Sequence, residues 1–193
     1  WSANLMLIET TKEPRFNRLA RRDDVARLLA PGAVGIELGV AEGEFASRVL
    51  SRSEIGFLYG VDMYAGDRGH DIDQYKRALR RLAPFQGRST LLHMRFDQAL
   101  DLFDDATFDF IYVDGYAHTG EEGGATFRDW WPKLKPGGLF AGDDYDRAAW
   151  PDVVANVDAF LSANSLTGYL IPFVEADVAY CKYPTWFTIK PSA

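Results

Sequence analysis

The stretch 36-IELGVAEGEF-45 decides the fold prediction for this chain. Its apolar start is typical of a buried strand, Gly39 and Gly43 frame a tight turn, and a helix is expected from about Glu44. A strand that runs through a glycine turn into a helix is the arrangement that α/β proteins use to hold a nucleotide-like ligand. The stretch therefore predicts an α/β fold with a nucleoside site at this turn.

Strand-like and helix-like segments alternate along the rest of the chain. Further strands are expected at 55–61, 90–94, 108–113, 139–141, 169–174 and 186–189, with helical patterns between them. This alternation predicts a mostly parallel sheet with helices on both faces and a ligand at the carboxyl ends of the strands. We expect a single domain over 1–193, with an N-terminal helical segment (1–31), a core (32–162) and C-terminal strands (163–193).

Two of the expected helices carry more detailed signals. Ile72, Tyr75, Leu79 and Leu82 are spaced like one face of a helix. Thr119 and Glu122 match a capping box, which predicts a helix that begins near Thr119 and ends at Pro136-Gly137-Gly138.

The composition excludes several classes of protein. The length of 193 residues suits one domain, and a net charge of -7 argues against a general nucleic-acid binder and favours a small ligand with positive charge. The longest apolar runs, such as 108–113, are too short to cross a bilayer. Cys181 is the single cysteine, which excludes an internal disulfide and fits a reducing, cytoplasmic location.

Two features concern the ends and the assembly of the chain. No secretory signal is recognisable, and the chain starts at Trp1 rather than at methionine, which leaves room for natural residues before it. The aromatic content of 14% is compatible with a homodimer, although no segment marks an interface.

The glycine turn lacks the features of a phosphate-binding loop. A dinucleotide fingerprint needs glycine where Ala41 and Glu44 stand, and the Gly-Lys-Ser/Thr of a P-loop is absent. Glu42 and Glu44 would repel a pyrophosphate at the start of the helix. S-adenosylmethionine fits better, because it has an adenosine, no phosphate and a positive sulfonium. The alternative is a nicotinamide-dependent oxidoreductase, and the missing glycines and the acidic residues of the turn argue against it.

The residues Asp62 and Met63 follow the second predicted strand in "LYGVDMY". A carboxylate at this place can accept hydrogen bonds from both ribose hydroxyls. Met63 can pack on the face of an adenine. The structural alternative is a solvated turn acid followed by a core methionine.

Four motifs together resemble class I S-adenosylmethionine-dependent methyltransferases. They are "GIELGVAEGEFA", "LYGVDMYAGDRGHD", "FDFIYVDGYAH" and "WWPKLKPGGLFAGDDYD", in the family's order between residues 32 and 162. The resemblance is greatest to the branch with small-molecule and sugar O-methyltransferases. It implies a Rossmann-like seven-stranded sheet with its last strand antiparallel, and a small hydroxyl acceptor such as a sugar or glycosylated metabolite. The predicted cofactor-binding residues are Glu37, Gly39, Val40, Ala41, Gly43, Asp62, Met63, Phe96 and Asp114.

The resemblance also implies a metal site. In the metal-dependent members of this branch, aspartates at strand ends hold a magnesium ion that binds the acceptor oxygens. The corresponding residues here are Asp114, Asp143 and Asp144. Carboxylate oxygens suit Mg²⁺, and the ion would lower the pKa of an acceptor hydroxyl. The alternative is that these aspartates cap the helices that follow them.

The catalytic base departs from the family pattern. Some sugar methyltransferases carry a second aspartate two residues after the first, where this chain has Tyr116. We therefore predict His118 as the base, with Asp114 beside it, because a neutral imidazole can accept a proton near neutral pH. Its alternative role is to cap a helix near Thr119.

Two other departures concern the cofactor and the acceptor. Phe96 stands near the place where relatives read the adenine amine, and its side chain can stack but cannot hydrogen-bond. Phe96, Arg95 and Tyr116 all depart from the family pattern. They support an alternative interpretation, in which the protein binds S-adenosylmethionine without catalysing a reaction. The polar loop 64–73 is either a solvated connection or a lid from which Arg68 or His70 contacts the acceptor.

Overall fold

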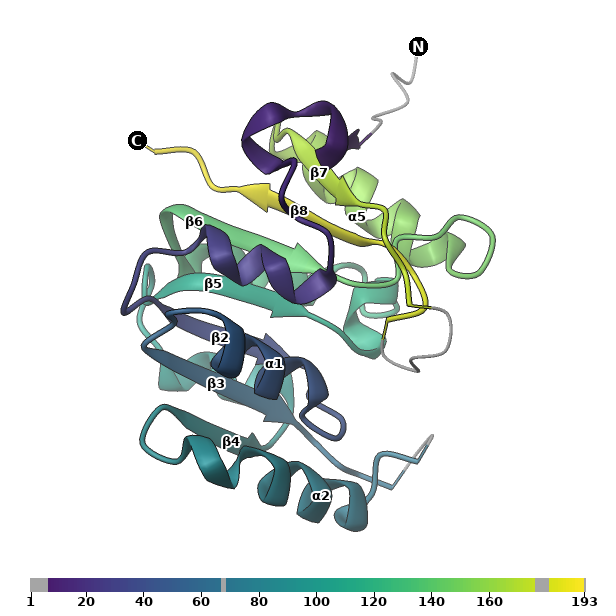
Figure 1. Ribbon diagram of the computed structural model, residues 1–193. Helices are drawn as coiled ribbons and strands as arrows, with labels where there is room; N and C mark the ends of the chain where they lie inside the picture. Colours follow the sequence, from purple (N-terminus) through teal and green to yellow (C-terminus); the bar gives the residue numbers. More distant parts are fainter. Residues whose placement is uncertain (1–6, 67–68, 176–180, 193) are drawn as a thin grey trace.

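The computed structural model describes residues 7–66, 69–175 and 181–192, which form one eight-stranded sheet between two layers of helices (Figure 1). The strands are β1 (Ile8–Glu9), β2 (Val34–Leu38), β3 (Phe57–Asp62), β4 (Ser89–His93), β5 (Phe108–Val113), β6 (Leu134–Gly142), β7 (Gly168–Ile171) and β8 (Thr185–Ile189). The α-helices are α1 (Glu44–Arg52), α2 (Ile72–Leu82), α3 (Phe96–Ala99), α4 (Ala125–Trp130) and α5 (Pro151–Ala163).

The strand order confirms the predicted Rossmann-like α/β fold. It is β1-β7-β8-β6-β5-β2-β3-β4, and every neighbouring pair is parallel except those of β8 with β6 and β7. The last strand is therefore inserted antiparallel, as the resemblance implied. The prediction of seven strands was one short, because β1 adds two residues beside β7. A segment of two residues has no periodicity from which a strand can be predicted.

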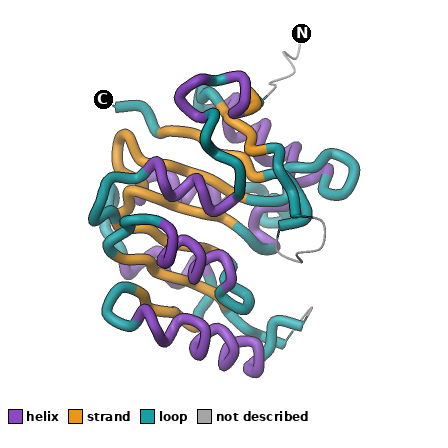
Figure 2. Tube along the Cα trace, in the orientation of Figure 1, coloured by secondary structure: helices purple, strands orange, loops and turns teal. Residues whose placement is uncertain are grey.

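Apolar side chains cover both faces of the sheet and explain the near-continuous hydrophobic runs of the central strands. Ile111 and Val113 of β5 pack in one cluster with Phe127 of α4, whereas Phe110 and Tyr112 pack in the other. Figure 2 shows the helices on the two sides of the strands. No helix within the described ranges is both long enough and apolar enough to span a membrane.

The N-terminal segment, predicted to be helical, contains β1 and three short 3₁₀-helices in its described part. The helices are η1 (Thr10–Lys12), η2 (Pro14–Phe16) and η3 (Arg22–Leu28). The buried Asp23 of η3 pairs with Arg52 of α1, whose Nη1 lies 2.6 Å from its Oδ2. Arg22, at the start of η3, pairs with Asp114 and Asp143, so that this end of η3 lies at the carboxyl ends of β5 and β6.

The helix at 72–82 has the predicted length but not the predicted buried face. Ile72 is 50% exposed and Leu79 is 44% exposed, whereas Ala78 and Leu82 are buried. Figure 1 shows α2 beside β4, and its buried residues Ala78 and Leu82 lie against Gly43 at the start of α1.

The predicted capping box at Thr119 and Glu122 does not form. Residues 116–119 form the 3₁₀-helix η6 (Tyr116–Thr119), and α4 begins at Ala125 after Gly124, which has a φ of 71°. The Glu122 carboxylate instead accepts a hydrogen bond of 2.5 Å from the hydroxyl of Thr126. A left-handed glycine therefore starts the helix in place of a side-chain cap.

The next boundary also differs from the prediction. Strand β6 begins at Leu134, so Pro136-Gly137-Gly138 lies within it rather than before it. The pairing of β5 with β6 shifts register between Phe108 and Phe110, which accommodates these residues as a bulge.

Candidate active site

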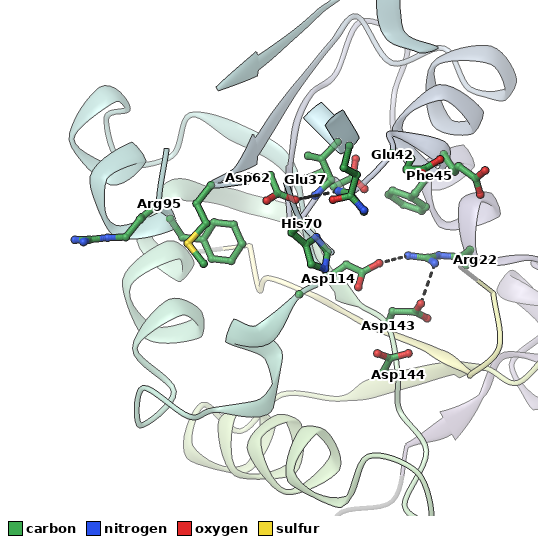
Figure 3. Close-up of a pocket in the computed structure, with 18 residues that line it drawn as sticks. Arg22, Glu37, Glu42, Phe45, Asp62, His70, Arg95, Asp114, Asp143 and Asp144 are labelled. Carbon is green, nitrogen blue, oxygen red and sulfur yellow. Dashed lines mark hydrogen bonds and ion pairs between the residues drawn. The ribbon is translucent and has the colours of Figure 1, made fainter. Parts of the chain in front are cut away.

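A cavity of about 510 Å³ opens at the carboxyl ends of β2, β3, β5 and β6 (Figure 3). Glu37 comes from β2, Asp62 ends β3, Asp114 follows β5, and Asp143 and Asp144 follow β6. The volume lies within the range of about 300–1,000 Å³ that is usual for small-molecule sites. The sheet therefore brings together acids that lie far apart in the sequence.

Gly39 is required by the close approach of two chain segments. Its φ is +95°, and a Cβ atom at this position would lie 1.3 Å from the backbone oxygen of Asp114. Gly43 has a φ of +76° and is the residue before α1. The glycine turn thus has the conformation that the sequence predicts, and any side chain at Gly39 would push β2 and β5 apart.

Asp62 holds the glycine turn in place. Its Oδ2 accepts hydrogen bonds from the backbone N–H of Val40 at 3.0 Å and of Ala41 at 2.9 Å, and its Oδ1 accepts one from Tyr64 at 3.2 Å. Two amides that could bind a pyrophosphate are therefore already occupied. Asp62 also lies on the cavity wall, where its remaining lone pairs can meet ribose hydroxyls.

Glu42 and Glu44 do not act as free charges at the start of α1. Arg77 Nε lies 2.8 Å from Glu42 Oε1, and Arg81 Nη1 lies 3.1 Å from Glu44 Oε1. These pairs weaken the charge argument against a phosphate ligand. The occupied amides of Val40 and Ala41 carry that argument instead.

The cavity wall is strongly acidic. Among the described residues, seven carboxylates and two arginines line it: Glu37, Glu42, Glu44, Asp62, Asp114, Asp143 and Asp144, with Arg22 and Arg95. Glu37 is buried, and its Oε2 has no hydrogen-bond partner in the part of the chain that the structure describes. Burial, with a further contribution from Asp114, raises the pKa of Glu37 well above its ordinary value. A ligand with positive charge would satisfy this group.

Eight of the nine predicted cofactor residues line the cavity. Met63 and Phe96 lie on its wall, as does His70 of the predicted lid. Gly43 is the exception, because it packs toward Leu82 beneath the turn. Arg68 and the side chain of Tyr116 lie outside the described residues.

Arg22 is a charged site residue that no sequence pattern indicated. It is 1% exposed, and its guanidinium lies between two acids, with Nη2 2.6 Å from Asp114 Oδ2 and Nη1 2.9 Å from Asp143 Oδ2 (Figure 3). The same group packs over the rings of Phe45 and Tyr112, at 4.9 and 5.3 Å from their centroids. Its stretch "ARRDDVARLL" reads as the solvated face of a helix, so no local signal marks it.

The three predicted metal ligands do not form a free carboxylate site. Both oxygens of Asp143 are engaged, since Arg22 contacts Oδ2 and the Thr185 hydroxyl donates to Oδ1 at 3.2 Å. Within the described part of the chain, Asp114, His118 and Asp144 are the group that brings metal-binding atoms within 4.8 Å of one another. The predicted Asp114–Asp143–Asp144 set therefore does not fit magnesium, because a guanidinium already balances two of its members.

Asp144 lies at the cavity and His118 lies behind it. The chain turns at Asp144, whose φ is 59°, so that both adjacent aspartates reach the cavity wall. His118 is 3% exposed, does not line the cavity, and has its Nε2 3.5 Å from Asp144 Oδ2. The predicted base thus does not face the cavity directly.

Burial sets the protonation of this pair. It lowers the pKa of His118, which favours a neutral imidazole near neutral pH. Burial and the nearby charge of Asp114 raise the pKa of Asp144 to about 8. Burial also raises the pKa of Asp143, to about 7. Asp144 is therefore a carboxyl group whose basicity suits proton transfer near neutral pH.

Comparison with known proteins places this site in a family. The family model described as "Methyltransferase domain" matches residues 36–145, which include the glycine turn, Asp62, Asp114 and both aspartates after β6. An "Uncharacterized protein y4gI" from Sinorhizobium fredii (strain NBRC 101917 / NGR234) is 36% identical over 97 residues. That match covers 50% of this chain and 10% of the relative, so the chain spans only a small part of that protein.

Two solved structures have a similar fold. An O-methyltransferase from Bacillus cereus in complex with SAH (S-adenosylhomocysteine) superposes with a TM-score of 0.64 at 15% identity, covering 87% of this chain and 80% of that one. An S-adenosylmethionine-dependent O-methyltransferase from Thermotoga maritima gives 0.64 at 16% identity, covering 95% and 71%. At these identities the likeness concerns the fold.

Proposed function

The chain belongs to the methyltransferase-domain family, and from this premise we propose that it transfers the methyl group of S-adenosylmethionine to a hydroxyl oxygen of a small molecule. The observation that carries the proposal is the acidic cavity around the glycine turn, in which the buried Glu37 has one oxygen, Oε2, with no hydrogen-bond partner among the described residues. A sugar or glycosylated metabolite is the acceptor class that we propose from the family resemblance.

The cavity offers a complementary contact for each part of the cofactor. Asp62 is placed to accept hydrogen bonds from the ribose hydroxyls, and Met63 and Phe96 provide apolar surface for the adenine. Glu37 and Asp114 supply negative charge for the sulfonium and the amino group. The absence of a phosphate in this cofactor agrees with the occupied amides of the turn.

The reaction needs alignment and the removal of one proton. An O–CH₃ bond forms as the S–CH₃ bond breaks, and the sulfonium becomes the neutral sulfide of S-adenosylhomocysteine. We propose that Asp144, on the cavity wall, takes the hydroxyl proton, and that His118 holds its carboxylate from behind. This assigns the predicted base His118 to a positioning role.

A metal ion has no step in this proposal. An ion held by Asp114, His118 and Asp144 would occupy one oxygen of Asp144 and lower the basicity of its carboxylate. Turnover in chelator separates the base from a metal site. If Asp144 acts as the base, turnover should be equally fast in magnesium and in chelator. Loss of turnover in chelator would favour a metal site.

Calorimetric titration with S-adenosylmethionine and S-adenosylhomocysteine tests the cofactor. Binding of both is expected; absence of binding would remove the proposed function, and preferential binding of NAD would favour the oxidoreductase alternative. A panel of hydroxylated acceptors, including sugars, then tests turnover. Binding without turnover on any acceptor would favour a non-catalytic cofactor-binding protein.

The substitution Asp144→Asn tests the proposed base. We expect turnover to fall by about 100-fold or more, since general-base catalysis contributes about 10²–10⁴ in rate. The affinity for S-adenosylhomocysteine should hardly change, because Asn keeps the shape of the side chain. Asp129→Asn, on helix α4 outside this cavity, is the matched control. Unchanged turnover in Asp144→Asn would contradict the role.

A further inference from the structure

We infer that Arg22 is a resident cation of this site, whose guanidinium pairs with Asp114 and Asp143 in place of the metal ion that the family resemblance implies. The inference rests on the proposed function only in treating this cluster as the reacting end of the cavity. Arg22 is thus a positioning residue that acts through the two aspartates.

Two ion pairs, a hydrogen bond and two aromatic rings hold the guanidinium in place. Its Nη atoms contact Asp114 and Asp143, and its Nε donates to the Tyr112 hydroxyl at 3.1 Å. Phe45 and Tyr112 also pack against its plane. A guanidinium is planar and has five N–H donors, so it can contact both aspartates and Tyr112 at once. The single ammonium of a lysine would leave at least one of these groups without a contact.

The segment that delivers Arg22 is itself tied to the fold. Asp23, the next residue, pairs with Arg52 of α1, and Asp24 accepts backbone hydrogen bonds from Ala20 and Arg21 at 3.0 and 2.9 Å. Arg21 also pairs with Glu175, which lies after β7. The position of the guanidinium is therefore built into η3 and does not depend on a bound ion.

The positive charge of Arg22 reduces the repulsion between Asp114 and Asp143. Asp114 and Asp143 are brought together by the ends of β5 and β6, and a half-buried and a buried carboxylate that contact the same guanidinium repel each other. One fixed positive charge between them reduces this repulsion and leaves the remaining acids for a cationic cofactor. An arginine stays charged at all physiological pH values, so this charge does not depend on the metal supply.

The experiment compares wild type with Arg22→Met and Arg22→Lys by thermal unfolding, in magnesium, in manganese and in chelator, without cofactor. We expect the wild-type midpoint to be the same in all three solutions. Arg22→Met should lose about 10 °C in chelator, because it leaves Asp143 buried and unpaired. Manganese or magnesium should restore part of that loss by entering the vacated place, and Arg22→Lys should fall between the two proteins.

A double-mutant cycle with Asp143→Asn isolates the pair. The double variant Arg22→Met/Asp143→Asn should be more stable than Arg22→Met alone, because the uncompensated charge is gone. If Arg22→Met does not fold, its refolding from denaturant is compared in manganese and in chelator. Recovery of native circular dichroism only with the ion supports the inference, and recovery in neither solution overturns it.

Four other results would overturn the inference. They are stabilisation of the wild type by micromolar metal, an Arg22→Met protein as stable as wild type, an unstable Arg22→Met protein that no ion rescues, and selective loss of cofactor binding. For the last, S-adenosylhomocysteine is compared with methylthioadenosine, which lacks the amino-acid carboxylate. A loss confined to S-adenosylhomocysteine would assign Arg22 to that carboxylate. Failure of the proposed function is distinguishable, because the melting experiments contain no cofactor or acceptor.

Discussion

Gly39 lies where the turn after β2 passes over the end of β5, and this contact leads to a prediction at the scale of one residue. In Gly39→Ala the added methyl group would overlap the backbone oxygen of Asp114, 1.3 Å away. We expect loss of S-adenosylhomocysteine binding in calorimetry and a fall of about 2 kcal/mol or more in the free energy of unfolding.

Gly87→Ala is the matched control for this change. Gly87 also has a positive φ, of +91°, but a Cβ atom there would meet nothing within 4 Å. Its substitution should cost only the backbone strain, about 1 kcal/mol, and leave binding intact. Equal effects of the two substitutions would show that backbone strain, and not the contact with Asp114, explains the effect of Gly39→Ala.

The residues of the candidate site could be predicted where they directly follow a strand-like apolar run. Gly39, Asp62 and Asp114 each stand directly after an apolar run, so the sequence alone indicates that they meet at one edge of the sheet. Arg22 could not be predicted in this way. Its carboxylate partner Asp114 lies 92 residues further along the chain, and Asp143 lies further still. No short-range spacing in the sequence encodes such contacts.

At the scale of elements, η3 depends on α1 for its position. Asp23 has a side chain that is 1% exposed, and Arg52 Nη1, at 2.6 Å, lies much closer to it than Arg48 Nη1, at 3.9 Å. In Arg52→Gln we expect a loss of about 1–3 kcal/mol in the free energy of unfolding, because a buried carboxylate loses its main partner. Hydrogen exchange should also become faster in peptides that contain η3.

The control for this prediction is Arg80→Gln, on the exposed face of α2. A surface substitution of this kind should change stability by no more than about 0.5 kcal/mol. If exchange in η3 were equally slow in Arg52→Gln and in Arg80→Gln, the pairing with Asp23 would not be what holds the element.

The elements differ in how far sequence could predict them. The strand before the glycine turn was predicted correctly, because Ile36 and Leu38 are apolar and Gly39 follows them. The predicted start of α4 was wrong, because α4 begins after the left-handed Gly124 and Glu122 accepts a hydrogen bond from Thr126 of that helix. Helix ends depend on backbone conformations that side-chain patterns do not specify.

For the whole molecule, the buried acids predict how stability changes with pH. Burial raises the pKa of Asp143 to about 7 and that of Asp144 to about 8, above their ordinary value of 3.8. The folded state therefore binds more protons than the unfolded state between these values. The stability that the two groups contribute is fully present below pH 3.8 and is lost as pH rises through about 7 and 8.

The pH dependence of stability should also differ between complexes with S-adenosylmethionine and with S-adenosylhomocysteine, because only the former has a positive sulfonium. A sulfonium favours ionised carboxylates, so stabilisation by S-adenosylmethionine should increase as pH rises from about 6 to 9, whereas stabilisation by the uncharged sulfide of S-adenosylhomocysteine should change less. Melting temperatures of the free protein and of both complexes across this range measure the effect. Asp144→Asn is the control, because it removes one of the titrating groups and should flatten the curve. A constant difference between the two ligands would mean that these aspartates do not share the cavity's charge with the sulfonium.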